Sequence, residues 1–304
     1  MYCTVSLTHG SRKEAIVHNQ TLTMDGPRLK QPRLNTRKKL IIYISLAAIY
    51  LLVILVVGLV MNPDMYGVHY DNSFLAPSLA HPFGTDIMGR DMFWRSVKGL
   101  SNSILVGLAA SAVSSVIALV FGVISAVIGG KVDRIIMWCV DCCMGIPHLV
   151  LLLLISYMMG RGGFGVAFAV AVTHWPELTR LVRAEVLQVR GSQYVKASLR
   201  MGHSWSQVAR EHIVPHVLPV YLIGLVLLFP HAIMHEASLT FLGFGFSAST
   251  PAIGGILSEA MEHIITGKWW LCLFPGLMLL IAVMLFDLIG EKLKLLLNPG
   301  SGNQ

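Results

Sequence analysis

Residues 40–61 read LIIYISLAAIYLLVILVVGLVM, a run of 22 residues without a charged side chain. An α-helix rises about 1.5 Å per residue, so about 20 apolar residues are enough to cross the hydrocarbon core of a bilayer. A surface helix of a soluble protein would carry charged residues along one face. The stretch is therefore predicted to be a transmembrane helix, and it decides the class of the fold.

Apolar stretches of similar character recur along the rest of the chain. Hydrophobic residues make up 55% of the sequence and charged residues 13%, whereas soluble domains usually carry about 25% charged residues. We therefore predict an all-α, polytopic membrane protein with six transmembrane helices. The five further spans are expected at residues 102–128, 135–159, 164–182, 214–239 and 270–293. The fourth of the six has the weakest signal, because Glu177 and Arg180 lie in its second half.

The lysines and arginines flank the apolar stretches in a pattern typical of membrane topology. The net charge is +7, but because the basic residues sit next to long apolar runs, we expect no nucleic-acid partner. Basic residues precede the first span and recur at Lys131 and Arg134, in residues 183–213 and at Lys292 and Lys294. Most acidic residues fall in the alternate loops. Both termini are therefore expected to be cytoplasmic.

The same pattern divides the chain into three parts. Residues 1–36 are polar and are expected to form a disordered cytoplasmic tail. Residues 37–101 hold the first span and an extracytoplasmic segment, and residues 102–299 form the core transmembrane domain. Two loops, 62–101 outside and 183–213 inside, are too long to be simple connections, so they are candidates for function.

Small residues recur every four positions in the second predicted span. The two rows are Gly107, Ser111 and Ser115, and Ala118, Gly122 and Ala126. Small side chains let helix backbones approach closely in lipid, where apolar burial alone does not drive association. The rows indicate a tightly packed bundle or a subunit interface, and ordinary membrane-helix composition is the simpler alternative.

The inner loop reads SQYVKASLRMGHSWSQVAREHIVP over residues 192–215. Gly202 suits the left-handed conformation that ends a helix. Ser204 with Gln207 three residues later is a capping box that would start another helix. Pro215 then either ends that second helix or opens the next span. Two short amphipathic helices are thus predicted to form a knob that is suited to docking a soluble partner.

This loop resembles the coupling-loop signature of binding-protein-dependent ABC importers, which is written Glu-Ala-Ala, then a glycine, then an apolar residue and a proline. The matching positions are Lys196, Ala197, Ser198, Gly202, Ile213 and Pro215. Two of them depart from the signature, because Lys196 replaces the acidic residue and Ser198 replaces the second alanine. The resemblance implies that these residues couple the chain to an ATPase.

Other segments resemble the dipeptide, oligopeptide and nickel branch of these permeases, and in particular its second permease subunit type. HPFGTD at 81–86 and GRD at 89–91 are similar to the Gly-Thr-Asp and Gly-Arg-Asp pair after the first span of that branch. ASLTFLGFG at 237–245 is similar to a Leu-Ser-Phe-Leu-Gly-Leu-Gly stretch after its fifth span. The resemblance covers residues 38–299 in the expected order.

The resemblance implies the ABC type I importer permease fold and a set of partners. These are a homologous second permease, two cytoplasmic ATPase subunits, an extracytoplasmic substrate-binding protein and membrane lipid. It also implies a location in a bacterial or archaeal cytoplasmic membrane. The chain itself is expected to bind no cofactor and to be no enzyme. Its sequence contains no Gly-x-x-x-x-Gly-Lys-Ser/Thr loop, so it would not hold ATP phosphates by that route.

Two histidines, His231 and His235, stand four residues apart in the fifth predicted span. Positions four apart on a helix share one face, and two imidazoles placed in this way can hold a nickel, zinc or copper ion. Met234 is a further candidate ligand, and the nickel permeases of the branch have a similar His-x-x-x-His and a His-Trp pair like His174-Trp175. We therefore expect translocation of nickel or a small metal chelate. The alternative is a dipeptide or oligopeptide permease whose histidines only hydrogen-bond neighbouring helices.

Two other classes of protein fit parts of the sequence less well. The histidines in apolar runs, namely His148, His174, His231 and His235, would suit an intramembrane metalloprotease, but His235-Glu236 lacks the second histidine of His-Glu-x-x-His. A stand-alone secondary transporter often shows inverted repeats with broken helices, and the sequence shows no such repeat. Six spans and one large inner loop suit a subunit better than a complete carrier.

Overall fold

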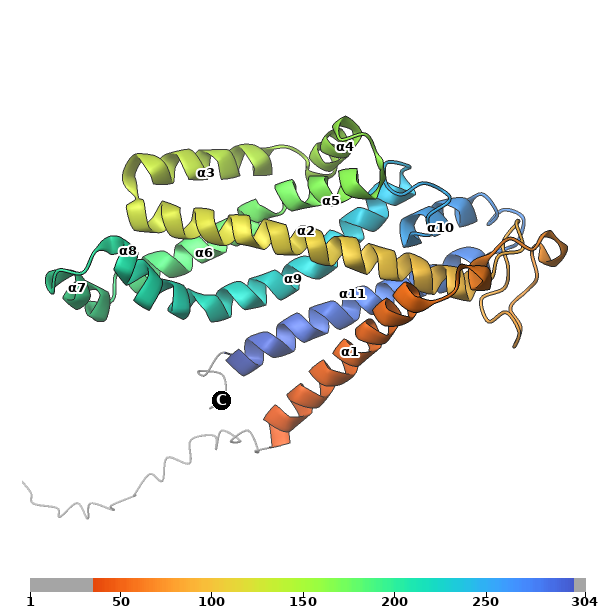
Figure 1. Cartoon of the computed structure of the whole chain (residues 1–304), viewed down its shortest axis with the longest axis horizontal. Coiled ribbons are helices and arrows are strands. Elements are labelled where there is room, and N and C mark those ends of the chain that lie inside the picture. Colours follow the sequence, from red (N-terminus) through yellow and green to blue (C-terminus); the bar gives the residue numbers. More distant parts are fainter. Residues whose placement is uncertain (1–34, 298–304) are drawn as a thin grey trace, which may run out of the picture.

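The computed structural model describes residues 35–297, with side chains from residue 38 onward, and this part of the chain is helical. Within it, the only strand-like contact is an isolated bridge between Thr85 and Asp91. The predicted tail at residues 1–36 lies almost wholly outside the described residues. In chain order the elements (Figure 1) are α1 (Asn35–Val60), η1 (Pro63–Tyr66), η2 (Tyr70–Asn72), α2 (Met92–Ile128), α3 (Gly130–Gly145), α4 (His148–Met158), α5 (Gly162–Thr173), α6 (Trp175–Arg190), α7 (Gln193–Arg200), α8 (Trp205–Val208), η3 (Ala209–Ile213), α9 (Val214–Phe241), α10 (Ile253–Met261) and α11 (Trp270–Leu297).

Four helices are long and apolar enough to cross a membrane. They are α1, α2, α11 and the continuous Trp205–Phe241 helix that contains α9. These helices confirm the first, second, fifth and sixth predicted spans. α2 begins at Met92 rather than at residue 102, because the Asp91 side chain accepts hydrogen bonds from the first backbone N–H groups and caps the helix there.

The third predicted span, residues 135–159, is broken. α3 and α4 meet at 95°, where Gly145 ends α3 and Pro147 precedes α4. Proline has no N–H to donate and restricts the residue before it to extended backbone, so the helix does not continue through this point. The pair is either one broken span or a re-entrant segment.

The fourth predicted span, residues 164–182, consists of two shorter helices. α5 has 12 residues and α6 has 16, and His174 lies at their junction. Pro176 occupies the first turn of α6, where its missing N–H interrupts the hydrogen bonding from the preceding turn. By length and composition, the described residues contain four spans, or five if the bent pair is one span, so the predicted count of six is not confirmed.

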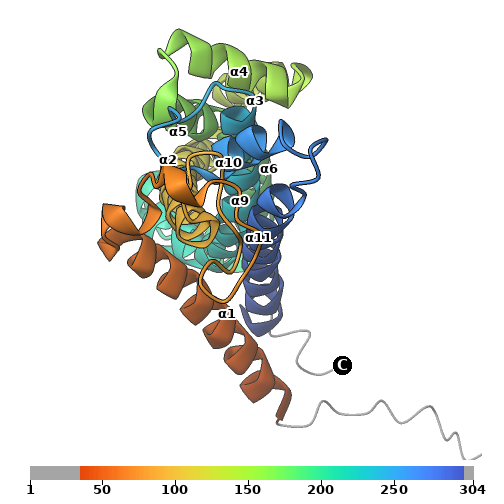
Figure 2. The same ribbon diagram turned by 90° about the vertical axis from the view of Figure 1, so that its right-hand side faces the viewer.

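α2 is the central helix and contacts α1, α5, α6 and α9 (Figures 1 and 2). All six members of the predicted small-residue rows are buried in these contacts. A Cβ on Gly107 would lie 2.6 Å from Cγ1 of Ile233 in α9, and a Cβ on Gly122 would lie 2.7 Å from Cγ1 of Val182 in α6. The rows therefore bring helices of one chain close together, which confirms the packed-bundle interpretation.

Replacing Gly107 by alanine is expected to destabilise the folded chain by about 1–3 kcal/mol, because the added methyl group overlaps Ile233 in a tightly packed core. The measurement is the thermal unfolding midpoint of the purified chain in detergent. Gly276→Ala is the matched control, since a Cβ there would meet Leu257 at an ordinary distance of 3.7 Å. Equal midpoints for the two variants would contradict the packing role of Gly107.

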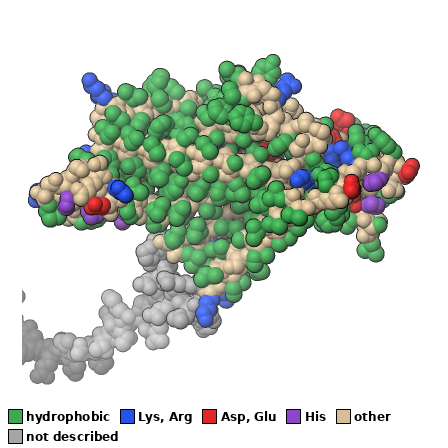
Figure 3. Space-filling model, in the orientation of Figure 1, with side chains coloured by type: hydrophobic (Ala, Val, Ile, Leu, Met, Phe, Trp, Pro, Cys, Tyr) green, Lys and Arg blue, Asp and Glu red, His purple; other side chains and the backbone are tan. Residues whose placement is uncertain are grey.

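The surface of the bundle fits an environment of lipid. Hydrophobic side chains cover the middle of the face shown in Figure 3, and charged side chains gather toward its two ends. α1 leaves large apolar side chains exposed along its length, among them Leu46, Ile49 and Leu52. An apolar belt of this extent would be costly in water and is the expected exterior of a membrane-embedded chain.

Candidate functional site

A pocket of about 570 Å³ lies where α3 breaks from α4. The pocket is lined by residues at the junction of α3 and α4, at the start of α6 and in α9. The volume is in the range that is typical of small-molecule sites. The lining residues include Pro147, His148, His174, Glu177, His231 and His235.

Three histidine rings meet in this pocket and are termed the histidine cluster: His148 at the start of α4, His174 between α5 and α6, and His235 in α9. The ring centroids are 4.8 Å apart for His148 and His174, 4.7 Å for His148 and His235, and 5.1 Å for His174 and His235. His174 is buried and the other two rings are half-buried. Three separate segments of the chain thus bring imidazoles into mutual contact.

The cluster contains two of the residues that the sequence singled out, His174 and His235. His231 lines the same pocket but lies outside the cluster. Met234 is half exposed and lines a different pocket, between α9 and α11. His148 was named only with the histidines that would suit a metalloprotease and was not among the residues predicted to contact a transported metal. The available signal was its position directly after the helix-breaking Pro147, which turns α4 so that its first residue lies beside α9.

A second pocket, of about 550 Å³, adjoins the first along α6 and α9. Glu177, Leu228 and His231 line both pockets, so the two pockets are neighbours. The walls of the second pocket are mainly leucine side chains, and Arg180 adds a charged group. Neighbouring pockets, one lined by imidazoles and the other by mainly apolar side chains, suit the binding of a small, partly polar solute.

α6 continues to Arg190, so residues 183–190 of the predicted loop 183–213 are helical, and the predicted helix break and helix start lie within residues 191–213. Gly202 has a φ of +93°, in the left-handed region, and follows the end of α7, so its predicted conformation is confirmed. Ser204 caps α8, because its hydroxyl accepts a hydrogen bond from the backbone N–H of Gln207 at 3.3 Å. The capping box is only half formed, since the Gln207 side chain donates to Glu211 at 3.2 Å instead of returning to the cap.

Pro215 opens the next span and does not end a helix. It lies in the first turn of α9, directly after the π-helical segment η3. Because Pro215 has no N–H, the carbonyl of Glu211 lacks its usual helical donor, and the wider π turn accommodates this irregularity. α8, η3 and α9 therefore continue as one helix from the loop into the bundle.

The signature residues of this loop divide into two groups. Ser198 and Ile213 are buried, and the Ser198 hydroxyl lies 3.0 Å from Nδ1 of His203. Lys196 and Ala197 are exposed. The serine that departs from the family signature thus stabilises the loop through a contact that alanine does not make. Lys196 and Ala197 lie on the surface, where a partner can reach them.

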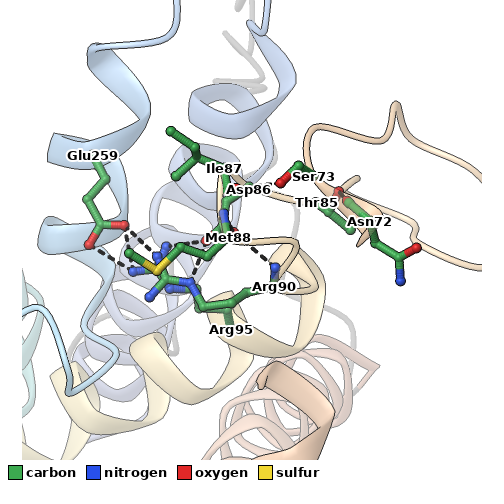
Figure 4. Close-up of polar contacts among 9 residues, drawn as sticks. All are labelled: Asn72, Ser73, Thr85, Asp86, Ile87, Met88, Arg90, Arg95 and Glu259. Atoms are coloured by element: carbon green, nitrogen blue, oxygen red, sulfur yellow. Dashed lines mark hydrogen bonds and ion pairs between the residues drawn. The ribbon is translucent and has the colours of Figure 1, made fainter. Parts of the chain in front are cut away.

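A network of ion pairs lies at the other end of the molecule (Figures 1 and 4). Asp86 accepts hydrogen bonds from Nε of Arg90 at 2.6 Å and from Nη1 of Arg95 at 3.1 Å. Glu259 in α10 pairs with Nη2 of Arg90 at 3.0 Å and with Nη2 of Arg95 at 2.7 Å. The network fastens the segment between α1 and α2 to α10. The sequence placed these charges in outer loops but did not pair them, because Arg95 and Glu259 are 164 residues apart.

The GRD motif of that segment requires its glycine. Gly89 has a φ of +69°, which L-amino acids with a side chain rarely adopt. A Cβ at this position would also overlap the carbonyl oxygen of His69. The motif therefore makes a tight turn that places Arg90 and Asp86 within reach of each other.

The described residues form a helical bundle with an apolar exterior and a solute-sized pocket, an arrangement that suits a membrane transport protein. Residues 118–301 match the protein family described as "Binding-protein-dependent transport system inner membrane component". The chain belongs to this family of ABC importer permeases.

Three curated relatives extend over most of the chain. The dipeptide transport system permease protein DppC of Bacillus subtilis (strain 168) is 29% identical over 94% of this chain and 92% of its own. The probable D,D-dipeptide transport system permease protein DdpC of Escherichia coli (strain K12) is 31% identical over 86% of this chain and 89% of its own. The oligopeptide transport system permease protein OppC of Bacillus subtilis (strain 168) is 31% identical over 84% of this chain and 85% of its own.

A solved structure has the same fold. The inward-facing MetNI methionine ABC transporter aligns with a TM-score of 0.56 at 20% identity, over 68% of this chain and 98% of that chain. The fold and the family together make the chain a multi-pass inner-membrane permease subunit. It is not an enzyme, and the ATPase of such a transporter is a separate subunit.

Proposed function

We propose that the chain is one of two permease subunits of an importer for dipeptides or short oligopeptides. The observation that carries the proposal is the solute-sized cavity between the α3–α4 break, α6 and α9, in a chain whose relatives are permeases for dipeptides and oligopeptides. Peptides were the alternative to nickel on sequence grounds, and these relatives support peptides better than nickel.

The partners in this proposal are a homologous second permease, two ATPase subunits and an extracytoplasmic binding protein. The exposed Lys196 and Ala197 beside the turn at Gly202 provide a surface for an ATPase at the loop of residues 183–213. Both termini then lie in the cytoplasm, because this loop and Lys292 and Lys294 carry the basic residues that mark the cytoplasmic side. The ion-pair network at the other end faces the binding protein.

Nickel, or a small complex of it, is the second candidate for the transported substrate. The specific observation in its favour is the histidine cluster, because imidazole is a good ligand for nickel, zinc and copper. The named relatives give this candidate no support, so it rests on His148, His174 and His235 alone.

Uptake by whole cells separates the two candidates. Cells that carry the complete transporter are expected to accumulate a labelled dipeptide, and deletion of this chain is expected to abolish that accumulation. Labelled Ni²⁺ supplied without a chelator is the parallel measurement, and no uptake that depends on this chain is expected. Uptake of Ni²⁺ without uptake of the dipeptide would refute the peptide proposal and leave nickel as the substrate.

A further inference from the structure

Two charged side chains of α6, Glu177 and Arg180, lie level with the middle of a membrane-crossing helix. α6 packs against α2 and α9, which are both long and apolar enough to cross a membrane. Glu177 and Arg180 line the second pocket together with Gly224 and Leu228, near the middle of α9. Both charged residues are exposed. Because a charge at this depth is costly in lipid, these side chains face a water-filled space or a bound solute.

Arg180 is held in position and still has hydrogen-bond donors to offer. Its Nη2 donates to Oδ1 of Asp141 in α3, and within residues 38–297 its side chain makes no other hydrogen bond or ion pair. A guanidinium group has five N–H donors, and 46% of the Arg180 side chain is exposed. The remaining donors can bind a carboxylate, for which the planar guanidinium is well suited. Asp141 therefore acts as a positioning residue for Arg180.

Glu177 offers the opposite charge on the same face of the helix. Residues three apart on a helix are neighbours, with Cβ atoms about 5–6 Å apart. Arg180 nevertheless pairs with Asp141 and not with Glu177. In the part of the chain that the structure describes, the Glu177 carboxylate makes no ion pair or hydrogen bond, and the residue lines both pockets. An unpaired carboxylate at a pocket wall is suited to a charge-assisted hydrogen bond from an ammonium group.

The spacing of these two charges matches the two ends of a dipeptide. An extended chain spans at most about 3.3–3.6 Å per residue, so the ammonium and carboxylate groups of a dipeptide lie no more than about 7 Å apart. Two side chains one helical turn apart can reach both groups at once. The pocket of about 550 Å³ and its leucine walls leave room for the peptide side chains. The termini of an extended longer peptide lie too far apart to contact both residues.

We propose that Glu177 and Arg180 form a binding site for the charged ends of a dipeptide. The Glu177 carboxylate accepts hydrogen bonds from the N-terminal ammonium group, and the Arg180 guanidinium donates to the C-terminal carboxylate. The inference rests on the proposed function, and it adds that this chain itself recognises the zwitterion. The alternative is that Arg180 and Asp141 only fasten α3 to α6, in which case neither charge responds to the ends of the peptide.

Binding is measured on the complete transporter in lipid nanodiscs, with the second permease and ATPases but without the binding protein. Labelled dialanine is the probe, and N-acetyl-dialanine and dialanine amide are the competitors that each lack one charge. For the wild type, loss of either charge is expected to weaken binding by at least about tenfold, because each charge makes a charge-assisted hydrogen bond.

Each variant is expected to lose its response to one end of the peptide. Glu177→Gln is expected to bind dialanine at least about tenfold more weakly and to be indifferent to N-acetylation, while amidation still weakens binding. Arg180→Gln is expected to show the reverse pattern. Glu185→Gln is the matched control in the same helix, because Glu185 lines neither pocket, and it is expected to bind like the wild type. Thermal unfolding midpoints show that the variants are folded, and Glu177→Gln removes no described side-chain contact.

Equal sensitivity to N-acetylation in Glu177→Gln and the wild type, or no binding of dialanine by the folded wild type, would overturn the binding site. Uptake of labelled dialanine into proteoliposomes, with the binding protein added outside, separates this failure from a failure of the proposed function. If the wild type accumulates dialanine although either of these results is found, the site is wrong and the peptide importer remains. If the complete wild-type transporter accumulates no dialanine, the proposed function is wrong, and the inference falls with it.

Discussion

Replacing Gly202 by valine is expected to reduce ATP-dependent uptake to less than about a tenth of the wild-type rate while the chain still inserts into the membrane. Gly202 has a φ of +93°, and an L-residue in the left-handed region costs roughly 1–2 kcal/mol, more for a β-branched side chain. A cost of 1.4 kcal/mol shifts the equilibrium between the native turn and other turn conformations about tenfold. The turn between α7 and α8 would relax, and the exposed Lys196 and Ala197 would no longer be presented to the ATPase in the native geometry.

The effect of this variant is confined to the backbone. A Cβ at Gly202 would meet no described atom within 4 Å, so valine creates no clash with a neighbouring helix. Gly202→Asn is the matched control, because asparagine tolerates the left-handed region and is expected to retain most of the uptake. The measurements are uptake of labelled dipeptide and the ATPase activity of the assembled transporter. Normal uptake by Gly202→Val would contradict the coupling role of this loop.

Replacing Asp86 by alanine is expected to destabilise the folded chain by about 3–5 kcal/mol, the cost of removing one partner from a buried ion pair. The Asp86 carboxylate accepts hydrogen bonds from the side chains of Arg90 and Arg95 and from the backbone N–H groups of Met88 and Arg90. Without it, the buried Arg95 faces Arg90 with only Glu259 to balance two positive charges. The segment between α1 and α2 would then detach from α10.

Thermal unfolding of the purified chain in detergent measures this effect. Asp64→Ala is the matched control, because Asp64 lies in the same segment between α1 and α2 and is exposed. Surface substitutions of this kind usually change the free energy of unfolding by less than about 0.5 kcal/mol. Equal unfolding midpoints for the two variants would show that the network in Figure 4 does not hold the segment in place.

The part of the fold that was predictable from the sequence is the part that depends on local pattern. The charge-free run at residues 40–61 and three similar runs form long helices. In lipid there is no water to bond the backbone N–H and C=O groups, so an apolar segment of this length forms these hydrogen bonds within its own helix. Gly202 adopts the left-handed conformation predicted for it, since glycine is the residue with the lowest cost there. The small-residue rows around Gly107 and Gly122 pack against neighbouring helices as their spacing indicated.

The remaining features depend on contacts that no local pattern encodes. Pro147 and Pro176 each interrupt an apolar run, so two predicted spans became pairs of shorter helices. His148 reaches the cluster only because the chain turns by 95° directly before it. The pairing of Arg95 with Glu259 joins residues that are distant in sequence, and nothing near either residue specifies its partner.

ATP-dependent transport into proteoliposomes tests the central claim most directly, namely that this chain is a permease subunit that needs separate ATPases to import small peptides. The chain is reconstituted with its second permease and both ATPases, and the binding protein and labelled dipeptide are added outside. We predict accumulation of the dipeptide that requires ATP at the ATPase side and that disappears when the ATPases or the binding protein are left out. Transport of the dipeptide by the chain alone, or failure of the complete set to accumulate any dipeptide, would contradict the account.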